Sequence, residues 1–379
     1  MWLCSAAIPA KSWVPCCCLH SLVRAVLALG ARPLARTATG RDGIRRVAST
    51  VTERPDPRPE TTFEVRGETY RLAVLRGPEM APLMPLYRDA FGRGLFSSEW
   101  LTRKYACERR GVGGFSCAAF TQSGEAAGSV GVLPWPVRFG DRVETAGQMV
   151  DVATGSAHRG RGLFVRLAEM AREVCEAAGV SFLFGFPNEA AYPIWINKLG
   201  YQHSDDLVEH RLPIRTIWAE RVARRVGALR PFYERHVQRT LSADVAADPV
   251  LENSVLLEGF AGTDRDRAFH AYKSSFAGSR VLAIDGGRVW LNLRHGLLVG
   301  DLEALSEADL DRTAHALERL ARRLGVHQIL FQASKDTRFS PFFANRFRTL
   351  PGMPVIYRNL RSQIPREKLR FTFGDLDNF

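Results

Sequence analysis

The chain has 379 residues, of which 46% are hydrophobic and 24% charged, a composition that excludes a disordered or fibrous protein. Single cores rarely grow beyond ~250 to 300 residues, so this length predicts two domains. The net charge of +12 comes almost entirely from two segments: residues 1–50 carry seven Lys and Arg against one acid, and residues 215–240 carry seven Arg against two Glu. We therefore expect no nucleic-acid partner, because the basic charge is not spread over a folded face.

The cysteines and the hydropathy exclude further classes of protein. Four of the seven cysteines precede residue 20, and the others are scattered at Cys107, Cys117 and Cys175. The sequence holds no CxxC pair and no HExxH motif, so we expect neither a disulfide framework nor a metal site. Isolated thiols are typical of a reducing cytosol, and no apolar run reaches the ~18 residues that a membrane helix needs. The sequence thus predicts a cytoplasmic protein.

Residues 1–60 differ from the rest of the chain. They are rich in Ala, Arg and Ser, lack apolar periodicity and end in a proline-rich stretch. This composition predicts a disordered N-terminal extension. An organelle-targeting segment has the same composition, so both interpretations stay open.

From residue 61 the chain consists of short β-rich runs separated by glycine turns, interrupted by apolar patterns of helical spacing. Two of the predicted helices end at Gly179 and Gly200, as helices commonly do. The order is a helix, an antiparallel meander, a helix, a strand and a helix. The predicted strands are 69–75, 115–120, 127–133, 143–154 and 180–186, and the predicted helices are 80–91, 162–178 and 190–199.

The second half of the chain repeats this pattern. Gly179 and the buried strand after it correspond to Gly325 and its following strand, and the elements before them correspond at the same offset. A shared order of elements at a fixed offset indicates a duplicated unit. The second set comprises predicted strands at 280–284, 289–293 and 297–302 and a predicted helix at 310–324.

Residues 214–240 lie between the two predicted units. Trp218 and Val226 share one helical face, while Arg221 and Arg225 lie on another. We expect a basic connecting helix whose apolar side packs and whose arginines face solvent. An anionic membrane surface or an acidic partner is the other interpretation of such a pattern.

The segment 156–164, between a predicted strand and a predicted helix, carries the chemistry. Gly160 and Gly162 allow a ligand to approach the backbone closely, and the N–H groups at a helix N-terminus attract anions. Arg159 and Arg161 add positive charge. This arrangement suits a pyrophosphate, although neither the dinucleotide-binding nor the P-loop motif is present.

With its flanks, this segment resembles the GNAT superfamily of N-acetyltransferases. The central GNAT motif matches Arg159-Gly160-Arg161-Gly162-Leu163-Phe164, with Phe164 in place of a small residue. A Gly-Phe-Pro-Asn run ends at Asn188, and a helix closing on Gly200 and Tyr201 follows it. The variant motif resembles that of a two-lobed GNAT branch. Leu305 and Ala308 replace Arg159 and Gly162 in the second unit, so we expect a single active site.

The resemblance implies an α+β fold with a mixed, mostly antiparallel sheet flanked by helices, followed by a second, degenerate GNAT-like lobe. The implied parts are a GNAT domain at 61–213, a connecting helix at 214–240 and the second lobe at 241–379. The implied function is transfer of an acetyl group from acetyl-CoA to the primary amine of a small molecule by direct attack, with an amino sugar as the more specific expectation. No metal is implied, and the oligomeric state is left open.

The resemblance also assigns residues to roles. The backbone of the strand before the loop pairs with pantetheine and polarises the thioester carbonyl. The implied cofactor-binding residues are Val152, Ala153, Thr154, Arg159, Gly160, Arg161, Gly162, Leu163, Phe164 and Asn188.

The acid and base are less directly indicated. Ile196 stands where the family has the tyrosine that acts as general acid. Tyr192, one helical turn earlier, is therefore the candidate acid. Asp151 is a candidate base because burial in an apolar strand would raise its pKa. Glu189 is a further candidate, although an acid in the first turn of a helix commonly complements the helix dipole. The resemblance offers one more candidate base, the chain's own C-terminal carboxylate, which ends an apolar and acidic tail.

Three other functions stay open at this point. A related two-lobed enzyme could transfer an aminoacyl or long-chain acyl group. A non-catalytic CoA-binding protein would fit the missing tyrosine, and a membrane-associated assembly protein would use the arginine-rich segment. The aromatic and cationic residues Trp100, Arg103, Lys104, Tyr105 and Trp135 could shape an acceptor pocket or simply pack.

Overall fold

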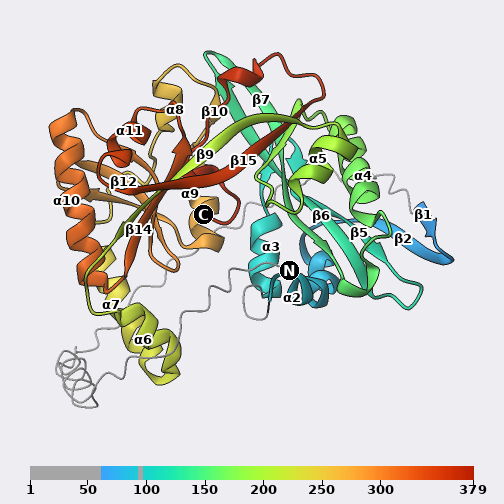
Figure 1. The fold of residues 1–379 in the computed structure, drawn as a ribbon, viewed down its shortest axis with the longest axis horizontal. Coiled ribbons are helices and arrows are strands. Elements are labelled where there is room, and N and C mark those ends of the chain that lie inside the picture. Colours follow the sequence, from blue (N-terminus) through green and yellow to red (C-terminus); the bar gives the residue numbers. More distant parts are fainter. Residues whose placement is uncertain (1–60, 93–96) are drawn as a thin grey trace, which may run out of the picture. The chain divides into compact units, whose positions relative to one another are not determined.

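The computed structural model describes residues 61–92 and 97–379, so the extension expected at 1–60 lies outside the described residues. The described strands form one 13-stranded sheet, with a separate two-stranded ribbon (Figure 1). Most neighbouring strands are antiparallel, and helices cover both faces. The predicted fold class, a mostly antiparallel mixed sheet flanked by helices, is confirmed.

The first half forms a meander that contains all five predicted strands, but β1 was not predicted and β6 is longer than the strand expected at 127–133. Successive strands pair antiparallel up to β7, and β8 then pairs parallel to β7. The strands are β1 (Thr61–Val65), β2 (Glu68–Leu75), β5 (Phe115–Phe120), β6 (Ala126–Phe139), β7 (Arg142–Thr154) and β8 (Phe182–Gly185).

The alternation of side chains along β6 divides the core of this half between two faces. Val130 and Val132 belong to the cluster under α4 (Leu163–Ala177) and α5 (Tyr192–Leu199). Leu133 and Trp135 point to the other face, in accord with the two-residue period of a strand. On that face lie η1 (Gly77–Leu83), α2 (Met84–Phe91) and α3 (Ser98–Tyr105).

One helix of this half differs from its prediction, and another was not predicted. The helix expected at 80–91 begins as the 3-10 helix η1 and becomes α-helical only at Met84. Pro82 lies inside η1 and Pro85 in the first turn of α2, and proline removes the N–H that an α-helical bond requires. The sequence analysis also missed α3, which begins at the N-cap Ser97.

The second half contains the elements expected from the internal repeat. The strands β11 to β13 are antiparallel, β14 is parallel to β13, and α10 packs on the same cluster. Their bounds are β11 (Arg280–Ile284), β12 (Gly287–Leu293), β13 (Leu297–Glu303), α10 (Glu307–Leu324), β14 (Gln328–Ser334) and α11 (Phe339–Ala344).

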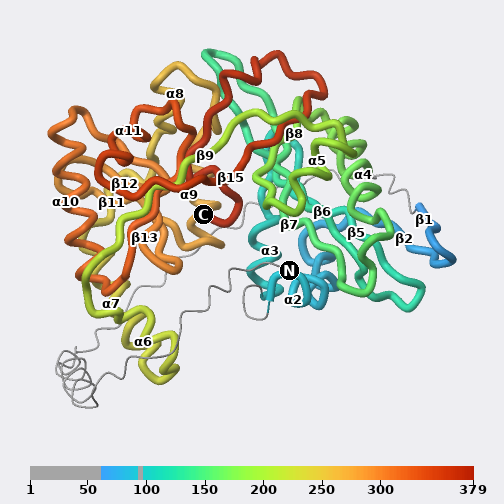
Figure 2. Tube along the Cα trace, in the orientation of Figure 1, coloured from blue at the N-terminus to red at the C-terminus, as the bar shows by residue number. Residues whose placement is uncertain are grey.

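Two long strands join the halves. β9 (Gln202–Pro213) comes from the first half and pairs with β14, while β15 (Arg348–Asn359) comes from the second half and pairs with β8. The strands β9 and β15 also pair with each other, which gives the order β8-β15-β9-β14 (Figure 2). Each half therefore contributes a strand to the sheet of the other. The division into domains at 213 and 241 remains a proposal.

The expected connecting helix is divided. Residues 219–242 form α6 (Ala219–Arg225), a short 3-10 turn and α7 (Arg230–Ser242). The interruption falls at Gly227, a poor helix former. The remaining elements are β3 (Glu108–Arg109), β4 (Val112–Gly113), η2 (Ser156–His158), η3 (Gly227–Leu229), α8 (Ser254–Leu257), β10 (Gly262–Thr263), α9 (Arg267–Ala277), η4 (Arg366–Lys368) and η5 (Phe373–Asp375).

Candidate functional site

The strands β7 and β8 pair only over part of their length. Their parallel ladder runs from Ala146 opposite Phe182 to Met149 opposite Gly185, while β7 continues to Thr154. On its other side β7 stays paired with β6, through an irregular register around Asp151, whose φ is 48°. The β8-facing edge of residues 150–154, which includes the predicted Val152, Ala153 and Thr154, is thus outside this ladder. Its backbone groups can hydrogen-bond to a ligand.

The glycine loop that follows is open. Gly160 and Gly162 have φ of 74° and 75°, and a Cβ added at either would meet nothing within 4 Å. Gly162 is the N-cap of α4 and offers no side chain to its first turn. The first N–H groups of a helix lack intrahelical partners and attract anions. Loop and helix together fit a pyrophosphate.

The two arginines of the loop differ. Arg159 is exposed, whereas Arg161 forms an ion pair with Glu68 of β2. Its hydrogen bond to Glu68 lowers the pKa of that carboxyl. Arg161 therefore fixes the loop against β2, and Arg159 is the arginine of the motif that faces solvent.

The sequence analysis missed the anchors of this loop. The Tyr70 hydroxyl donates to Glu68 Oε2 at 2.5 Å and lies 3.0 Å from Nδ1 of His158. On the other side, Asp89 Oδ2 accepts a hydrogen bond from the Ser156 N–H at 3.0 Å. Glu68, Tyr70 and Asp89 belong to β2 and α2, far before the motif in the chain, so local spacing gives no signal for them.

The side chains of the last residues of the motif pack inside the protein. Leu163 is buried, and the ring of Phe164 packs edge-to-face on Trp195 of α5 with centroids 5.0 Å apart. This contact explains the aromatic residue at the end of the motif, because it joins α4 to α5. Asn188 Oδ1 accepts a hydrogen bond from the Ala191 N–H at 2.9 Å and so shapes the turn before α5.

Asp151 is the centre of a buried charged cluster. Both carboxylate oxygens accept hydrogen bonds from Lys104 Nζ at 2.8 Å, and Oδ2 also accepts one from the Tyr105 hydroxyl at 2.8 Å. Lys104 Nζ further contacts Asp377 Oδ2 at 2.6 Å. The side chains of Lys104 and Asp151 are only 1% and 7% exposed, while that of Asp377 is 24% exposed. The cluster therefore opens toward solvent on the side of Asp377.

The electrostatics of the cluster follow from burial and pairing. Burial raises the pKa of Asp151, and Lys104 opposes this shift. Burial alone would lower the pKa of Lys104, but Asp151 and Asp377 raise it above its ordinary value. Burial also raises the pKa of Tyr105, so this hydroxyl stays protonated and donates to Asp151.

The other predicted acid and base lie apart from this cluster. The Tyr192 hydroxyl lies 3.2 Å from Nδ1 of His203 on β9, and Glu189 is exposed in the turn before α5. Among the described residues the structure thus places the three predicted groups in two settings: Asp151 under α3, and Tyr192 and Glu189 at the start of α5.

The residues expected to shape an acceptor pocket have separate roles. Lys104 and Tyr105 hold Asp151, and Trp135 is buried and donates from its ring nitrogen to Gln148 Oε1 at 2.6 Å. Arg103 is exposed and pairs with Glu99 at 2.6 Å. Only Trp100 lines the cavity described below, among these five residues.

The sequence analysis did not assign Asp377 to the site. Its position is fixed by buried contacts of the C-terminal segment: Arg265 pairs with Asp301 at 2.6 Å and with Asp375 at 2.8 Å, all three side chains being fully buried. Lys273 Nζ donates to the Leu376 carbonyl at 2.5 Å. These partners are distant from the segment in sequence, so only the fold brings them together.

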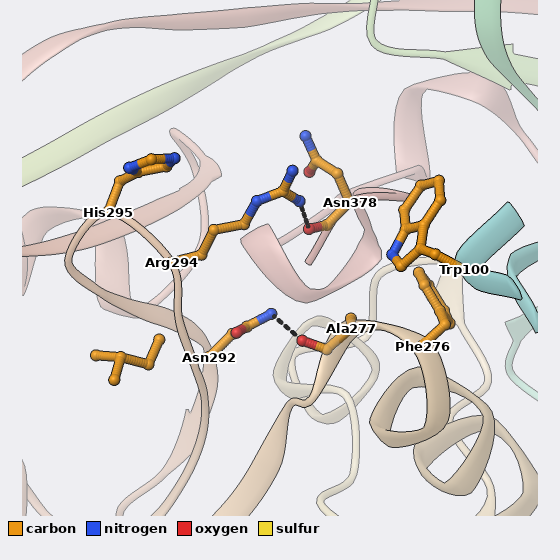
Figure 3. Close-up of a pocket in the computed structure, with 8 residues that line it drawn as sticks. Trp100, Phe276, Ala277, Asn292, Arg294, His295 and Asn378 are labelled. Carbon is orange, nitrogen blue, oxygen red and sulfur yellow. Dashed lines mark hydrogen bonds between the residues drawn. The ribbon is translucent and has the colours of Figure 1, made fainter. Parts of the chain in front are cut away.

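A cavity of about 360 Å³ (Figure 3) lies beside Trp100, a neighbour of the charged cluster. Trp100 connects the two, because it lines the cavity and its ring lies 5.1 Å from Lys104 Nζ. On another wall, Arg294 donates to the Asn378 carbonyl at 3.2 Å, next to Asp377. The lining residues are Trp100, Phe276, Ala277, Asn292, Leu293, Arg294, His295 and Asn378.

Comparison with known proteins concerns the part of the chain that holds this site. Residues 79–204 match the acetyltransferase (GNAT) domain, and this range includes β7, the glycine loop and all of α5. The match assigns this part of the chain to the GNAT domain and supports acyl transfer as its class of activity. A search of curated proteins found no match.

Solved structures resemble this chain at low sequence identity, and the first of those described here shares its fold. A probable N-acyltransferase of Enterococcus faecalis V583 has a TM-score of 0.52 at 14% identity and covers 78% of this chain and 74% of its own. A GCN5-related N-acetyltransferase of Kribbella flavida has a TM-score of 0.49 at 14% identity, with 78% and 72% covered. A putative acetyltransferase of Pyrococcus horikoshii has a TM-score of 0.48 at 13% identity, with 81% and 94% covered.

Within 61–92 and 97–379, no three His, Cys, Asp or Glu side chains are grouped so that they could hold a metal ion. No helix in these ranges is long and apolar enough to span a membrane. Cys107, Cys117 and Cys175 are free and buried.

Proposed function

We propose that the protein transfers the acetyl group of acetyl-CoA to the primary amine of a small molecule. The observation that carries this proposal is the open edge of β7 beside the glycine loop of α4, within a GNAT domain. A strand edge that can pair with an extended chain and an anion-binding loop at a helix N-terminus together suit pantetheine and pyrophosphate.

In this proposal the backbone does most of the binding. Residues 152–154 pair with pantetheine, and one of their N–H groups polarises the thioester carbonyl. Gly160, Arg161 and Gly162 surround the pyrophosphate, and Arg159 supplies the exposed positive charge. Leu163 and Phe164 act through packing, and Asn188 fixes the turn at the other side of the groove. Acetyl-CoA supplies an activated thioester, so no metal is needed.

Asp151 is the proposed base. It takes the proton that the amine loses as it attacks the thioester carbonyl, because burial raises its pKa toward that of a useful base. Lys104 and Tyr105 are positioning residues that hold its carboxylate. Tyr192 is the proposed acid and returns a proton to the departing thiolate, with His203 as its partner. Glu189 is the alternative base.

The cavity beside Trp100 is the proposed acceptor site. Two aromatic rings, Trp100 and Phe276, face amide and guanidinium groups of Asn292, Arg294 and Asn378. Aromatic faces combined with a few polar groups are usual for a polar small molecule, and an amino sugar fits this description. The three buried free thiols support a cytoplasmic location.

A non-catalytic CoA-binding protein is the second candidate. It is favoured by Ile196 at the position of the family's tyrosine and by the separation of Tyr192 from the Asp151 cluster. The two candidates differ in turnover. A transferase of aminoacyl or long-chain acyl groups would instead fail to bind acetyl-CoA tightly.

The test combines acetyl-CoA binding with turnover. We expect acetyl-CoA to raise the melting temperature and a panel of amines, amino sugars included, to elicit thiol release. Gly162→Glu should lower acetyl-CoA affinity ten-fold or more, ~1.4 kcal/mol, because a carboxylate would meet the pyrophosphate. Gly162→Ala is the control, since it shares the strain of a positive φ but not the charge. Equal affinity in these two variants would sink the cofactor assignment, and binding without turnover would favour the second candidate.

A further inference from the structure

The segment 217–232, which includes α6 and η3, exposes large apolar side chains, and two of them, Trp218 and Val226, were expected to pack. Ile217, Trp218, Val226 and Phe232 are 64%, 46%, 45% and 44% exposed. The buried residues of α6 are instead Glu220 and Ala223. Figure 1 shows α6 projecting from the end of β9, beyond the sheet. Four large exposed apolar groups in one short segment mark an interaction surface.

The same surface is strongly basic. Its acids are largely neutralised, because Glu220 is buried 3.6 Å from Arg224 and Glu234 pairs with Arg230 at 2.8 Å. The arginines are exposed. They are Arg215, Arg221, Arg224, Arg225, Arg230, Arg235 and Arg239.

The end of α10 extends this basic surface. Thr216 Oγ1 donates to the Arg322 carbonyl at 3.2 Å, and the Tyr233 hydroxyl donates to the Leu324 carbonyl at 3.0 Å. These contacts bring Arg322 and Arg323 beside α6 and α7. Both side chains are about half exposed, at 54% and 55%, and each forms an ion pair, Arg322 with Glu318 at 3.0 Å and Arg323 with Asp244 at 3.8 Å.

We propose that this surface, residues 215–239 with Arg322 and Arg323, docks on an anionic lipid membrane. Cationic and apolar groups are interspersed on it: the Arg221 guanidinium lies 5.0 Å from the centre of the Trp218 ring. An indole at headgroup depth beside a guanidinium near lipid phosphates is the pattern of an interfacial anchor. The proposal is independent of the acetyl-transfer function.

The exposed apolar side chains favour a membrane over other anionic partners. Nucleic acids bind mainly through neutralisation of phosphates, which arginines alone accomplish. A lipid surface also buries apolar side chains below its headgroups. On the docked protein, the acyl region of the membrane would bury the four apolar side chains, and the lipid phosphates would pair with the arginines. The apolar side chains are Ile217, Trp218, Val226 and Phe232.

The experiment is co-sedimentation of the full chain with vesicles. We expect binding to vesicles of equal parts phosphatidylglycerol and phosphatidylcholine, release in high salt because exposed charges are screened, and no binding to phosphatidylcholine alone. The double variant R221E/R225E should bind at least ~25-fold more weakly, since each interfacial arginine contributes about fivefold. Trp218→Ala should weaken binding as well.

Matched variants elsewhere on the surface serve as controls. Leu305→Ala removes an apolar side chain that is 89% exposed, and Arg267→Glu reverses an exposed arginine of α9. Both should bind like the unaltered chain. Residues 1–50 are also basic, so all comparisons use the full chain, and melting temperatures verify that each variant is folded. Equal binding to neutral vesicles, no binding to anionic ones, or binding unchanged in R221E/R225E would overturn the proposal, as would binding to DNA or polyglutamate but not to vesicles.

Discussion

Asp151 lies where β7 continues beyond its ladder with β8, and its positive φ coincides with the irregular pairing of β7 and β6. A carboxylate there is close to the backbone edge that is proposed to bind the thioester. Lys104 compensates its charge, and an unpaired buried charge would be strongly destabilising. The sequence identified Asp151 as an acid inside an apolar strand. The rest of its cluster comes from α3 and from the C-terminal segment, and no local pattern could indicate groups so distant in the chain.

Replacing Asp151 tests its role as base. Asp151→Asn keeps the size of the side chain and leaves Lys104 paired with Asp377, so we expect a folded protein. The turnover number should fall ~100-fold or more, the usual range for loss of a general base, with little change in acetyl-CoA affinity. Asp285→Asn, at an exposed carboxylate in the turn between β11 and β12, is the matched control. Undiminished turnover in Asp151→Asn would exclude this residue as the base.

The burial of Lys273 predicts how the stability of the protein depends on pH. Its ammonium lies 5.6 to 5.9 Å from the centres of three aromatic rings, and burial lowers its pKa from 10.5 to about 7. Between these values the unfolded chain binds more protons than the folded one, so the contribution of Lys273 to stability rises with pH and is lost as pH falls toward 7.

The variant Lys273→Met should lack this dependence. Between pH 7 and pH 9, we expect the free energy of unfolding of the unaltered protein to rise relative to that of the variant. The rise is at most ~1.4 kcal/mol per pH unit. Denaturant titrations of both proteins at the two pH values measure the difference. A constant difference would mean that Lys273 is charged in the folded protein at both.

At the scale of elements, the sequence predicted α4, α10 and the short strands well, because each has an apolar face with a regular period and a glycine or turn at its end. It did not predict that 202–213 and 348–359 are long strands. Their burial is uneven, with exposed and half-buried positions along much of both, so no clean alternation marks them. Their pairing is with each other and with β8 and β14, which only the assembled sheet specifies.

The C-terminal segment, residues 372–379, contains one 3-10 turn, η5, and its position is fixed by contacts with the core. Gly300 on β13 is essential for this, because a Cβ there would lie 2.3 Å from Cζ of Phe379. We expect Gly300→Ala to destabilise the protein by ~1–3 kcal/mol through overpacking, and to lower turnover because Asp377 is close to Phe379 in the chain. Melting temperature and thiol release measure both effects.

A second substitution distinguishes this clash from a general effect on β13. Phe379→Leu makes the side chain smaller, so the double variant G300A/F379L should recover much of the stability and turnover lost in Gly300→Ala. Non-additivity of this kind is expected for residues in direct contact. If the two losses simply add, Gly300 does not act through Phe379.

At the scale of the whole described part, the sequence offset that aligns Gly179 with Gly325 also aligns the elements of the two halves. It aligns β8 with β14, and β9 (Gln202–Pro213) with β15 (348–359). The order β8-β15-β9-β14 therefore places the equivalent strands β9 and β15 side by side at the centre. The repeat could be predicted from the sequence, but the exchange of β9 and β15 between the two halves could not. The residues of a strand do not determine which of two equivalent sheet edges it joins.

The exchange leads to a prediction about the GNAT half alone. Without the second half, β8 loses its neighbour β15 and β9 loses both of its neighbours. Exposed strand edges of this kind promote aggregation, and Lys104 would also lose Asp377. We therefore expect residues 61–213 to lack a cooperative thermal transition when expressed alone, and co-expression with residues 214–379 to restore one. The chain 57–379, a compact unit by its internal contacts, is the positive control. A cooperative transition and protected amide hydrogens in 61–213 alone would show that the strand exchange is dispensable for folding.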